Sequence, residues 1–191
     1  EGQGKNWWDA SITGSVPGLG ESRPDLLHVT DSRDVLLEDL TLYDSPHFHV
    51  RFSQCINVEV RRIKIDVDRF AQREVKAKAH ANRLTRHGFM PNTSAALDFT
   101  RRLYHRHQHA DDWRDWLLDQ AVKLLPAWAL QPEDLNTDGI DPNGAGFYVH
   151  DCEINNDDDS IAVKPADGST KTGCSKDMLF ENLVLTGFGA S

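Results

Sequence analysis

An eight-residue pattern of apolar positions recurs four times along this chain of 191 residues, and it constrains the fold more than any other feature. Each copy is apolar at its first, third, sixth and eighth positions. Alternation with a period of two is typical of a strand, so the change of phase in the middle predicts a strand, a bend and a second strand. The four octets are residues 35–42, 58–65, 147–154 and 178–185.

The distances between the octets suggest how they stack. The first two begin 23 residues apart, and the last two begin 31 residues apart. Coils of this length, each packing its apolar residues on the next, are typical of a parallel β-helix. We therefore expect a mainly β fold, a parallel β-helix or solenoid in which the octets lie side by side. The handedness of such a helix is not encoded in the repeat.

The middle interval of 89 residues is too long for one coil, and the excess lies in residues 70–134. Apolar residues recur there at spacings of three and four, which is the pattern of a helix. Glycine and proline punctuate the segment. We expect two or three α-helices inserted into one loop of the solenoid, whose coils are residues 1–69 and 135–191. The alternative is that 1–69 and 135–191 are separate domains, and the shared octet argues against it.

Charge and composition exclude two classes of partner. The formal net charge of −9 disfavours nucleic acid, because nucleic-acid binding depends on Lys and Arg neutralising phosphates. No apolar run approaches the roughly 20 residues of a membrane span. Asn92 opens a glycosylation sequon, which is weak support for secretion. The three cysteines allow at most one internal disulfide, and both a pairing of Cys152 with Cys174 and buried free thiols remain open.

Two acidic clusters carry the candidate chemistry, and they lie in residues 136–141 and 156–164. Each is followed by a short apolar run, so its carboxylates sit beside strands. Asp138, Asp158 and Asp159, held close together on a rigid sheet, suit general acid and base catalysis at a glycosidic bond. The alternatives are a solvated acidic turn, which is less favoured for a cluster of this kind, and a calcium site, which no EF-hand spacing supports.

Two motifs are fairly specific when they occur together in such a repeat. One is Asn-Thr-Asp-Gly-Ile-Asp at 136–141, and the other is the Asp158-Asp159 pair that leads into Ile-Ala-Val-Lys at 161–164. With these motifs the chain resembles glycoside hydrolase family 28, the polygalacturonases and their relatives. The resemblance covers residues 1–69 and 135–191 and leaves out the helical insertion. Weaker likenesses lie at 2–4, 7–8, 44–46 and 187–191.

The resemblance implies a right-handed parallel β-helix and a secreted, extracellular enzyme that hydrolyses pectic galacturonan with inversion. It assigns to Asp158 the role of general acid and to Asp138 and Asp159 the activation of the attacking water. We expect no cofactor, no metal and a monomer when the protein has its full length. Lys164, the only cation beside the acidic clusters in sequence, is the candidate to touch a substrate carboxylate.

The chain departs from the family pattern in three places. Phe188 occupies the position between two glycines where the family has histidine, and it is a second candidate for substrate binding, by stacking on a sugar, unless it packs in the core. The Arg-x-Lys motif that grips the substrate carboxylate in the family is not found. Ser160 stands where a cysteine usually follows the aspartate pair.

Three further expectations follow. Successive strand residues point to opposite faces, so Asp158 and Asp159 should lie at a bend or bulge. Close packing of like charges should raise the pKa of one of these two carboxyls. Asn136 and Asp141 should fix the turn of their coil through side-chain hydrogen bonds to the backbone. The alternative to an enzyme is a non-catalytic β-helix that binds carbohydrate, or a protein partner through the helical insertion.

Overall fold

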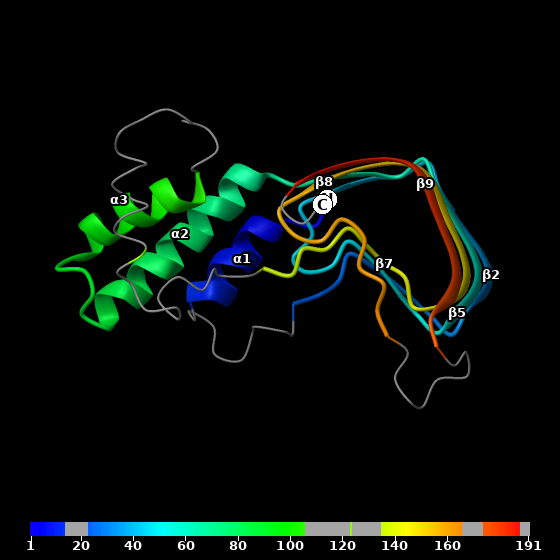
Figure 1. Cartoon of the computed structure of the whole chain (residues 1–191), viewed down its shortest axis with the longest axis horizontal. Coiled ribbons are helices and arrows are strands. Elements are labelled where there is room, and N and C mark those ends of the chain that lie inside the picture. Colours follow the sequence, from blue (N-terminus) through cyan, green and yellow to red (C-terminus); the bar gives the residue numbers. More distant parts are fainter. Residues whose placement is uncertain (14–22, 106–122, 124–134, 166–173, 188–191) are drawn as a thin grey trace. The chain divides into compact units, whose positions relative to one another are not determined.

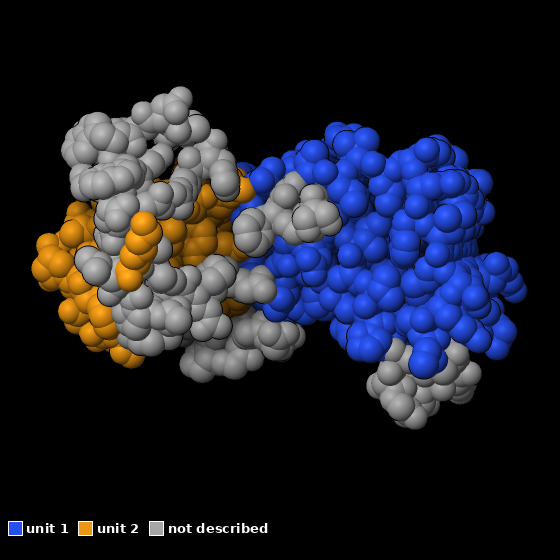
Figure 2. All heavy atoms as spheres, viewed as in Figure 1, with its two compact units in different colours: residues 1–7, 21–69, 135–191 blue, residues 8–20, 70–134 orange. Residues whose placement is uncertain are grey.

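The computed structural model describes residues 1–13, 23–105, 123, 135–165 and 174–187 (Figure 1). It divides into two compact units (Figure 2). Unit 1 comprises residues 1–7, 21–69 and 135–191, and unit 2 comprises residues 8–20 and 70–134. None of the helices within the described residues has the length and apolar character that crossing a membrane requires.

Unit 1 consists of parallel strands, and every pairing among its described strands is parallel. This confirms a mainly β fold with parallel sheets. One sheet has the order β1-β4-β7, and the other has the order β2-β5-β8-β6-β3, with β9 added beside β8. The strands are β1 Leu27–Thr30, β2 Arg33–Glu38, β3 Thr41–Tyr43, β4 Val50–Ser53, β5 Cys55–Arg61, β6 Lys64–Asp66, β7 Ile140–Asp141, β8 Gly144–Asn156 and β9 Lys176–Gly187.

The four octets lie side by side in register (Figure 1). Their first residues, Val35, Val58, Phe147 and Met178, form one row across β2, β5, β8 and β9. All four apolar positions of the second and third octets are buried in one hydrophobic core. Each such side chain stabilises the fold by roughly 1.5–3 kcal/mol, so the repeat seen in the sequence is the packing repeat of the core.

One left-handed residue causes the change of phase within each octet. The fifth position has φ of 57° at Asp39, 53° at Arg62, 54° at Asp151 and 52° at Asn182. The left-handed conformation turns the strand, so that the third and sixth positions both face the core. Asp and Asn tolerate this conformation better than most residues. Arg62 is the exception, and its Nε donates to the Asp39 carboxylate of the neighbouring coil at 2.6 Å.

A second row of left-handed residues marks the other bend of the large sheet. It consists of Asp34, Asn57, Gly146 and Asp177, with φ between 54° and 73°. The side-chain amide of Asn57 donates to the Asp34 carboxylate at 2.5 Å, so neighbouring coils are also joined by side chains.

The inserted segment is helical where the structure describes it. The helices are α2 Arg69–Arg86 and α3 Thr93–Tyr104, and the shorter α1 Gly4–Thr13 lies near the start of the chain. Asn92 caps α3, because its side-chain oxygen accepts the Ala95 N–H at 2.8 Å. Thr100 of α3 donates to the Ala77 carbonyl of α2 at 2.8 Å. The rest of the expected helical segment, residues 106–134, lies outside the described residues except for residue 123.

The cysteines are free thiols. Cys55 and Cys152 are buried in the core of unit 1, and Cys174 is exposed. The pairing of Cys152 with Cys174 that the sequence left open is therefore absent.

Gly144 is where two coils approach most closely, and its replacement tests the stacking. Its φ is 138°, and a Cβ atom there would lie 1.9 Å from the Cys55 carbonyl oxygen. We expect Gly144→Ala to destabilise the chain by about 3 kcal/mol or more, because neither backbone can give way. The measurement is urea unfolding followed by circular dichroism. Gly146→Asn is the matched control, since its φ of 73° suits Asn and the nearest atom to a Cβ lies 3.5 Å away. Equal stability of the two variants would contradict the predicted close approach.

Candidate active site

The segments that carry the candidate carboxylates run parallel and adjacent to each other. Gly139 N–H donates to the Asp159 carbonyl at 2.9 Å, and Ile140 N–H donates to the Ser160 carbonyl at 3.0 Å. Ile140 and Ile161 form a parallel bridge. Asp138 immediately precedes Gly139 and Asp159 immediately precedes Ser160, so the two aspartates occupy matching positions on neighbouring segments, just before this bridge.

A buried amide holds the turn that carries Asp158 and Asp159. Asn156 is fully buried, and its side-chain nitrogen donates to the Asp159 carbonyl at 2.9 Å and to the Thr137 carbonyl at 3.2 Å. Its side-chain oxygen accepts the Ser160 hydroxyl at 3.2 Å. The amide therefore joins the turn to the coil of Asp138. Ser160 stands where the family has cysteine. Its hydroxyl donates to the buried Asn156 side chain, and a thiol would form a weaker hydrogen bond there.

The three candidate aspartates differ in their surroundings. Asp138 is buried, Asp158 is half-buried and Asp159 is exposed. The chain bends at 157–158, and one carboxylate oxygen of Asp158 accepts the N–H of Asp159 at 2.8 Å. The bend lets consecutive aspartates avoid the strict alternation of a strand.

Lys164 is held by the acidic cluster. Its Nζ lies 2.7 Å from Oδ2 of Asp138 and 3.3 Å from Oδ2 of Asp141. It also lies 4.8 Å from the centre of the Phe48 ring, which adds a cation–π contact. Burial lowers the pKa of Lys164, but the two neighbouring carboxylates outweigh it and hold that pKa above its ordinary value.

Asp141 also belongs to this cluster, although no chemical role was expected for it from the sequence. The expectation that it fixes a turn is wrong, because it lies in strand β7 and is fully buried. Burial, together with the charge of Asp138, raises the pKa of Asp141 to about 8, although Lys164 opposes the shift. The raised pKa expected at Asp158 or Asp159 stays a prediction; the raised pKa that the structure shows in this cluster is that of Asp141. The sequence signal was its place in the same acidic motif, three residues after Asp138 and directly after the core residue Ile140.

His49 is a second residue that the sequence analysis missed. Its backbone N–H and its Nδ1 lie 2.9 Å and 3.0 Å from the Asp138 carbonyl oxygen. The Ser45 N–H donates to its Nε2 at 3.3 Å, which leaves the ring proton on Nδ1 to be donated to Asp138. Burial lowers the pKa of His49 to about 4, against the opposing effect of these backbone hydrogen bonds. A neutral, fully buried ring thus positions the backbone of Asp138.

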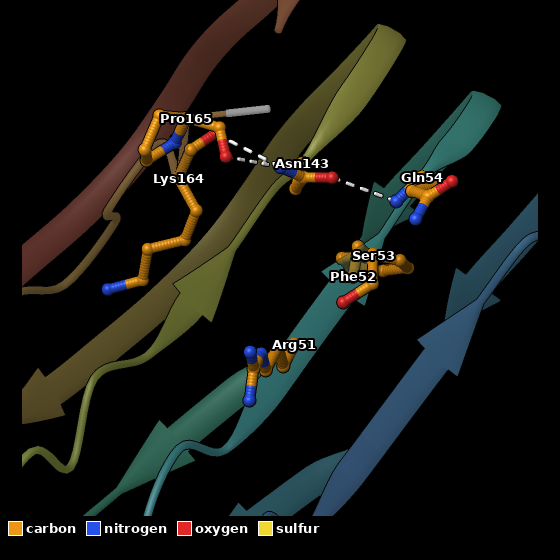
Figure 3. A pocket seen from close by; sticks show the side chains of 7 residues that line it. All are labelled: Arg51, Phe52, Ser53, Gln54, Asn143, Lys164 and Pro165. Atoms are coloured by element: carbon orange, nitrogen blue, oxygen red, sulfur yellow. Dashed lines mark hydrogen bonds between the residues drawn. The ribbon is translucent and has the colours of Figure 1, made fainter. Parts of the chain in front are cut away.

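A pocket of about 240 Å³ adjoins the cluster at Lys164 (Figure 3). Asn143 spans one side of it, because its side chain accepts the Gln54 N–H at 2.8 Å and donates to the Pro165 carbonyl at 2.8 Å. Arg51 is the second cation of the pocket, and its guanidinium lies 3.5 Å from Asp25. The lining residues are Arg51, Phe52, Ser53, Gln54, Asn143, Lys164 and Pro165.

Two expectations about the site, on a metal ion and on Phe188, stay predictions. Within the ranges that the structure describes, no group of three or more His, Cys, Asp or Glu side chains is arranged to hold a metal ion. Phe188 lies outside the described residues.

Comparisons with known proteins point to one family. Residues 1–93 match the model of glycosyl hydrolases family 28. A polygalacturonase of Juniperus ashei is 35% identical over 72 residues, which are 36% of this chain and 14% of that protein. A polygalacturonase of Ralstonia solanacearum is 25% identical over 167 residues, which are 86% of this chain and 25% of that protein. An alignment that covers so much of the chain necessarily includes positions 138–159.

These relatives are much longer than this chain, which spans about a quarter of the bacterial polygalacturonase and less of the plant protein. No solved structure gives a significant match.

The amide of Asn156 offers a test of how the turn is held. We expect Asn156→Ala to lower the free energy of unfolding by about 2–3 kcal/mol, because three hydrogen bonds are lost and the buried Ser160 hydroxyl loses its acceptor. Ser160→Ala, which removes one of these bonds, should cost about 1 kcal/mol. The measurement is chemical denaturation, with Asn182→Gly as a control that suits the left-handed φ of 52° at that position. An Asn156→Ala chain as stable as the control would contradict this role.

His49 predicts a loss of stability in acid. Its pKa is near 6.5 when unfolded and about 4 when folded, so its contribution is complete above pH 6.5 and is lost as the pH falls to 4. The loss is about 3 kcal/mol. Unfolding in urea at pH 7 and at pH 4 should show that acid destabilises the wild type by about 3 kcal/mol more than it destabilises His49→Asn. The same pH dependence in both chains would show that His49 does not titrate in this way.

Proposed function

We propose that this chain, whose residues 1–93 belong to glycosyl hydrolases family 28, serves the hydrolysis of glycosidic bonds in pectic galacturonan. The single observation that carries the proposal is the adjacency of the Asp138 segment to the turn of Asp158 and Asp159, which backbone hydrogen bonds and a parallel bridge join. The similarity to polygalacturonases supports the same substrate class. A polysaccharide of this kind lies outside the cell, so we propose a secreted protein.

The finer fold that we propose is a right-handed parallel β-helix with α2 and α3 inserted in one loop. Parallel pairing of all four octets in one row supports it. So do the two rows of left-handed residues, because they turn successive coils at the same place. In such a fold the acidic residues of neighbouring coils face one cleft.

The proposed mechanism is a single displacement with inversion. Asp158 protonates the leaving oxygen, and Asp138 with Asp159 activates the water that attacks from the opposite side of the sugar ring. Lys164, at 2.7 Å, stabilises negative charge on Asp138 and so favours its role as base. The exposure of Asp159 leaves that carboxylate accessible to water and substrate. Inverting enzymes place acid and base roughly 6.5–9.5 Å apart, which leaves space for the water.

Recognition of an acidic sugar is proposed for the pocket beside Lys164. Arg51 is the more available cation, since its side chain is 41% exposed and its distance to Asp25 is 3.5 Å. Lys164 holds Asp138 more closely, so within the pocket we assign the substrate carboxylate first to Arg51 and second to Lys164. Stacking of Phe188 on a sugar stays a prediction.

Replacement of Asp158 tests the enzymatic function. We expect Asp158→Asn to lower the rate of reducing-end release from polygalacturonate by 10²–10⁴-fold, because Asn cannot donate the proton. The melting temperature should stay unchanged. Asp177→Asn removes the same charge from an exposed position where Asn suits the left-handed φ of 54°, and it should retain full activity. Proton NMR of the first product should show inversion at the anomeric carbon.

Two outcomes would overturn the proposal. Equal turnover by the Asp158→Asn and Asp177→Asn chains would remove Asp158 from the mechanism. A wild-type chain that binds oligogalacturonides without cleaving them, with affinity unchanged in Asp158→Asn, would favour the alternative of a non-catalytic carbohydrate-binding β-helix. The end of the family match at residue 93, before all three aspartates, is the observation that keeps this alternative in view.

A further inference from the structure

Asp141 lies inside the acidic cluster, and the mechanism above gives it no role. Its side chain is fully buried, yet it belongs to the two-residue strand next to Asp138. It shares Lys164 with Asp138, at 3.3 Å and 2.7 Å respectively. One ammonium group therefore lies between two carboxyl groups, only one of which has a proposed chemical role.

We propose that Asp141 is a positioning residue that stays protonated while the site is active, and that its neutrality reserves the charge of Lys164 for Asp138. This inference rests on the proposed function, because it assumes that Asp138 is the base. Asp141 itself is not expected to touch the substrate. It acts through Lys164.

The surroundings of Asp141 favour its neutral form. Among the residues that the structure describes, neither of its carboxylate oxygens has a hydrogen-bond partner of good geometry. A buried carboxylate without hydrogen bonds costs several kcal/mol, whereas a protonated carboxyl costs much less. The protein thus provides a site in which the acid form is the stable one.

The charges that face Asp141 come from three neighbouring segments. Asp138, just before its own strand, is negative and disfavours a second negative charge. Lys164, from the adjacent strand, attracts it but is already paired with Asp138 at the shorter distance. Arg51 of β4 stands beside Asp141 in register, but its guanidinium reaches toward Asp25. Burial and Asp138 together outweigh Lys164, so that the pKa of Asp141 is raised to about 8.

Loss of this proton has a direct consequence for Asp138. Below that pH, Lys164 faces one carboxylate and one neutral acid. Above it, two carboxylates compete for one ammonium, and Asp138 loses part of the compensation that fixes its charge and its orientation. The structure therefore predicts that the site weakens on the alkaline side, through a residue that takes no part in proton transfer to the substrate.

The direct test is a titration of the Asp141 carboxyl carbon by NMR in the uniformly ¹³C-labelled wild-type chain. We expect a midpoint near pH 8, several pH units above the ordinary value of an aspartate. This readout needs no activity, so it is informative even if the chain does not cleave polygalacturonate. A midpoint near pH 4 would overturn the inference, whatever the activity.

Asp141→Asn separates a positioning role from a catalytic one. Asn imitates the neutral acid, so we expect kcat at pH 5 within about threefold of the wild type and an alkaline limb moved up by at least one pH unit. Asp177→Asn should keep the wild-type profile. A loss of more than a hundredfold at pH 5 in a folded chain would show that the proton itself is used and would overturn the inference.

The pH dependence of stability gives a second measurement. A folded pKa raised above the unfolded value contributes stability that is fully present below pH 4 and is lost as the pH rises through 8. The melting temperature of the wild type should therefore fall, relative to that of Asp141→Asn, between pH 4 and pH 8. If the melting temperatures of the wild type and of Asp141→Asn changed with pH in the same way, this would contradict a proton held on Asp141 between pH 4 and pH 8.

Discussion

The parallel hydrogen bonds between the strand of Asp138 and the segment after Asp159 are the interaction on which the site depends. They join residues from two acidic motifs that are separate in sequence, and they fix the register to a single residue. A slip of one position would turn Asp138 away from the cluster and bring Gly139 in its place, because strand side chains alternate between faces. Asn156 adds side-chain hydrogen bonds across the same two segments. The hydrogen bonds that stack these two segments therefore also fix the geometry of the site.

The parallel pairing could be predicted from the sequence because it repeats. Each octet presents the same four apolar positions, and Val58 pairs with Phe147 although the two lie 89 positions apart in the sequence. The cause of the phase change could not be derived in the same way. Three of the four left-handed residues are Asp or Asn, which is a usable signal, but Arg62 occupies the same position without one. Its ion pair with Asp39 is visible only once the coils are stacked.

Most residues of the candidate site could be predicted from the sequence, but the shifts of their pKa values could not. The motifs identified Asp138, Asp158, Asp159 and Lys164, and the structure brings the Asp138 and Lys164 side chains together and sets Asp159 beside the Asp138 strand. Burial is a property of the neighbours, and the neighbours of Asp141 come from other coils. For this reason a residue that was expected in a turn is the one whose pKa is raised. His49 was not predicted for the same reason, because its ring contacts Ser45 and Asp138 only in the folded chain.

The backbone on both sides of residues 70–134 is anchored within unit 1. Before the insertion, the Val67 N–H donates to the Asn155 carbonyl at 2.9 Å. After it, the buried Arg23 donates to the Leu135 carbonyl at 2.6 Å and to the Pro46 carbonyl at 2.8 Å. The entropy of closing a loop grows only slowly with its length, by about 0.6 kcal/mol for each doubling, so fixed ends matter more than the number of residues between them. The backbone hydrogen bonds described for the Asp138 segment join it to residues 49–50 and 159–160, outside residues 70–134.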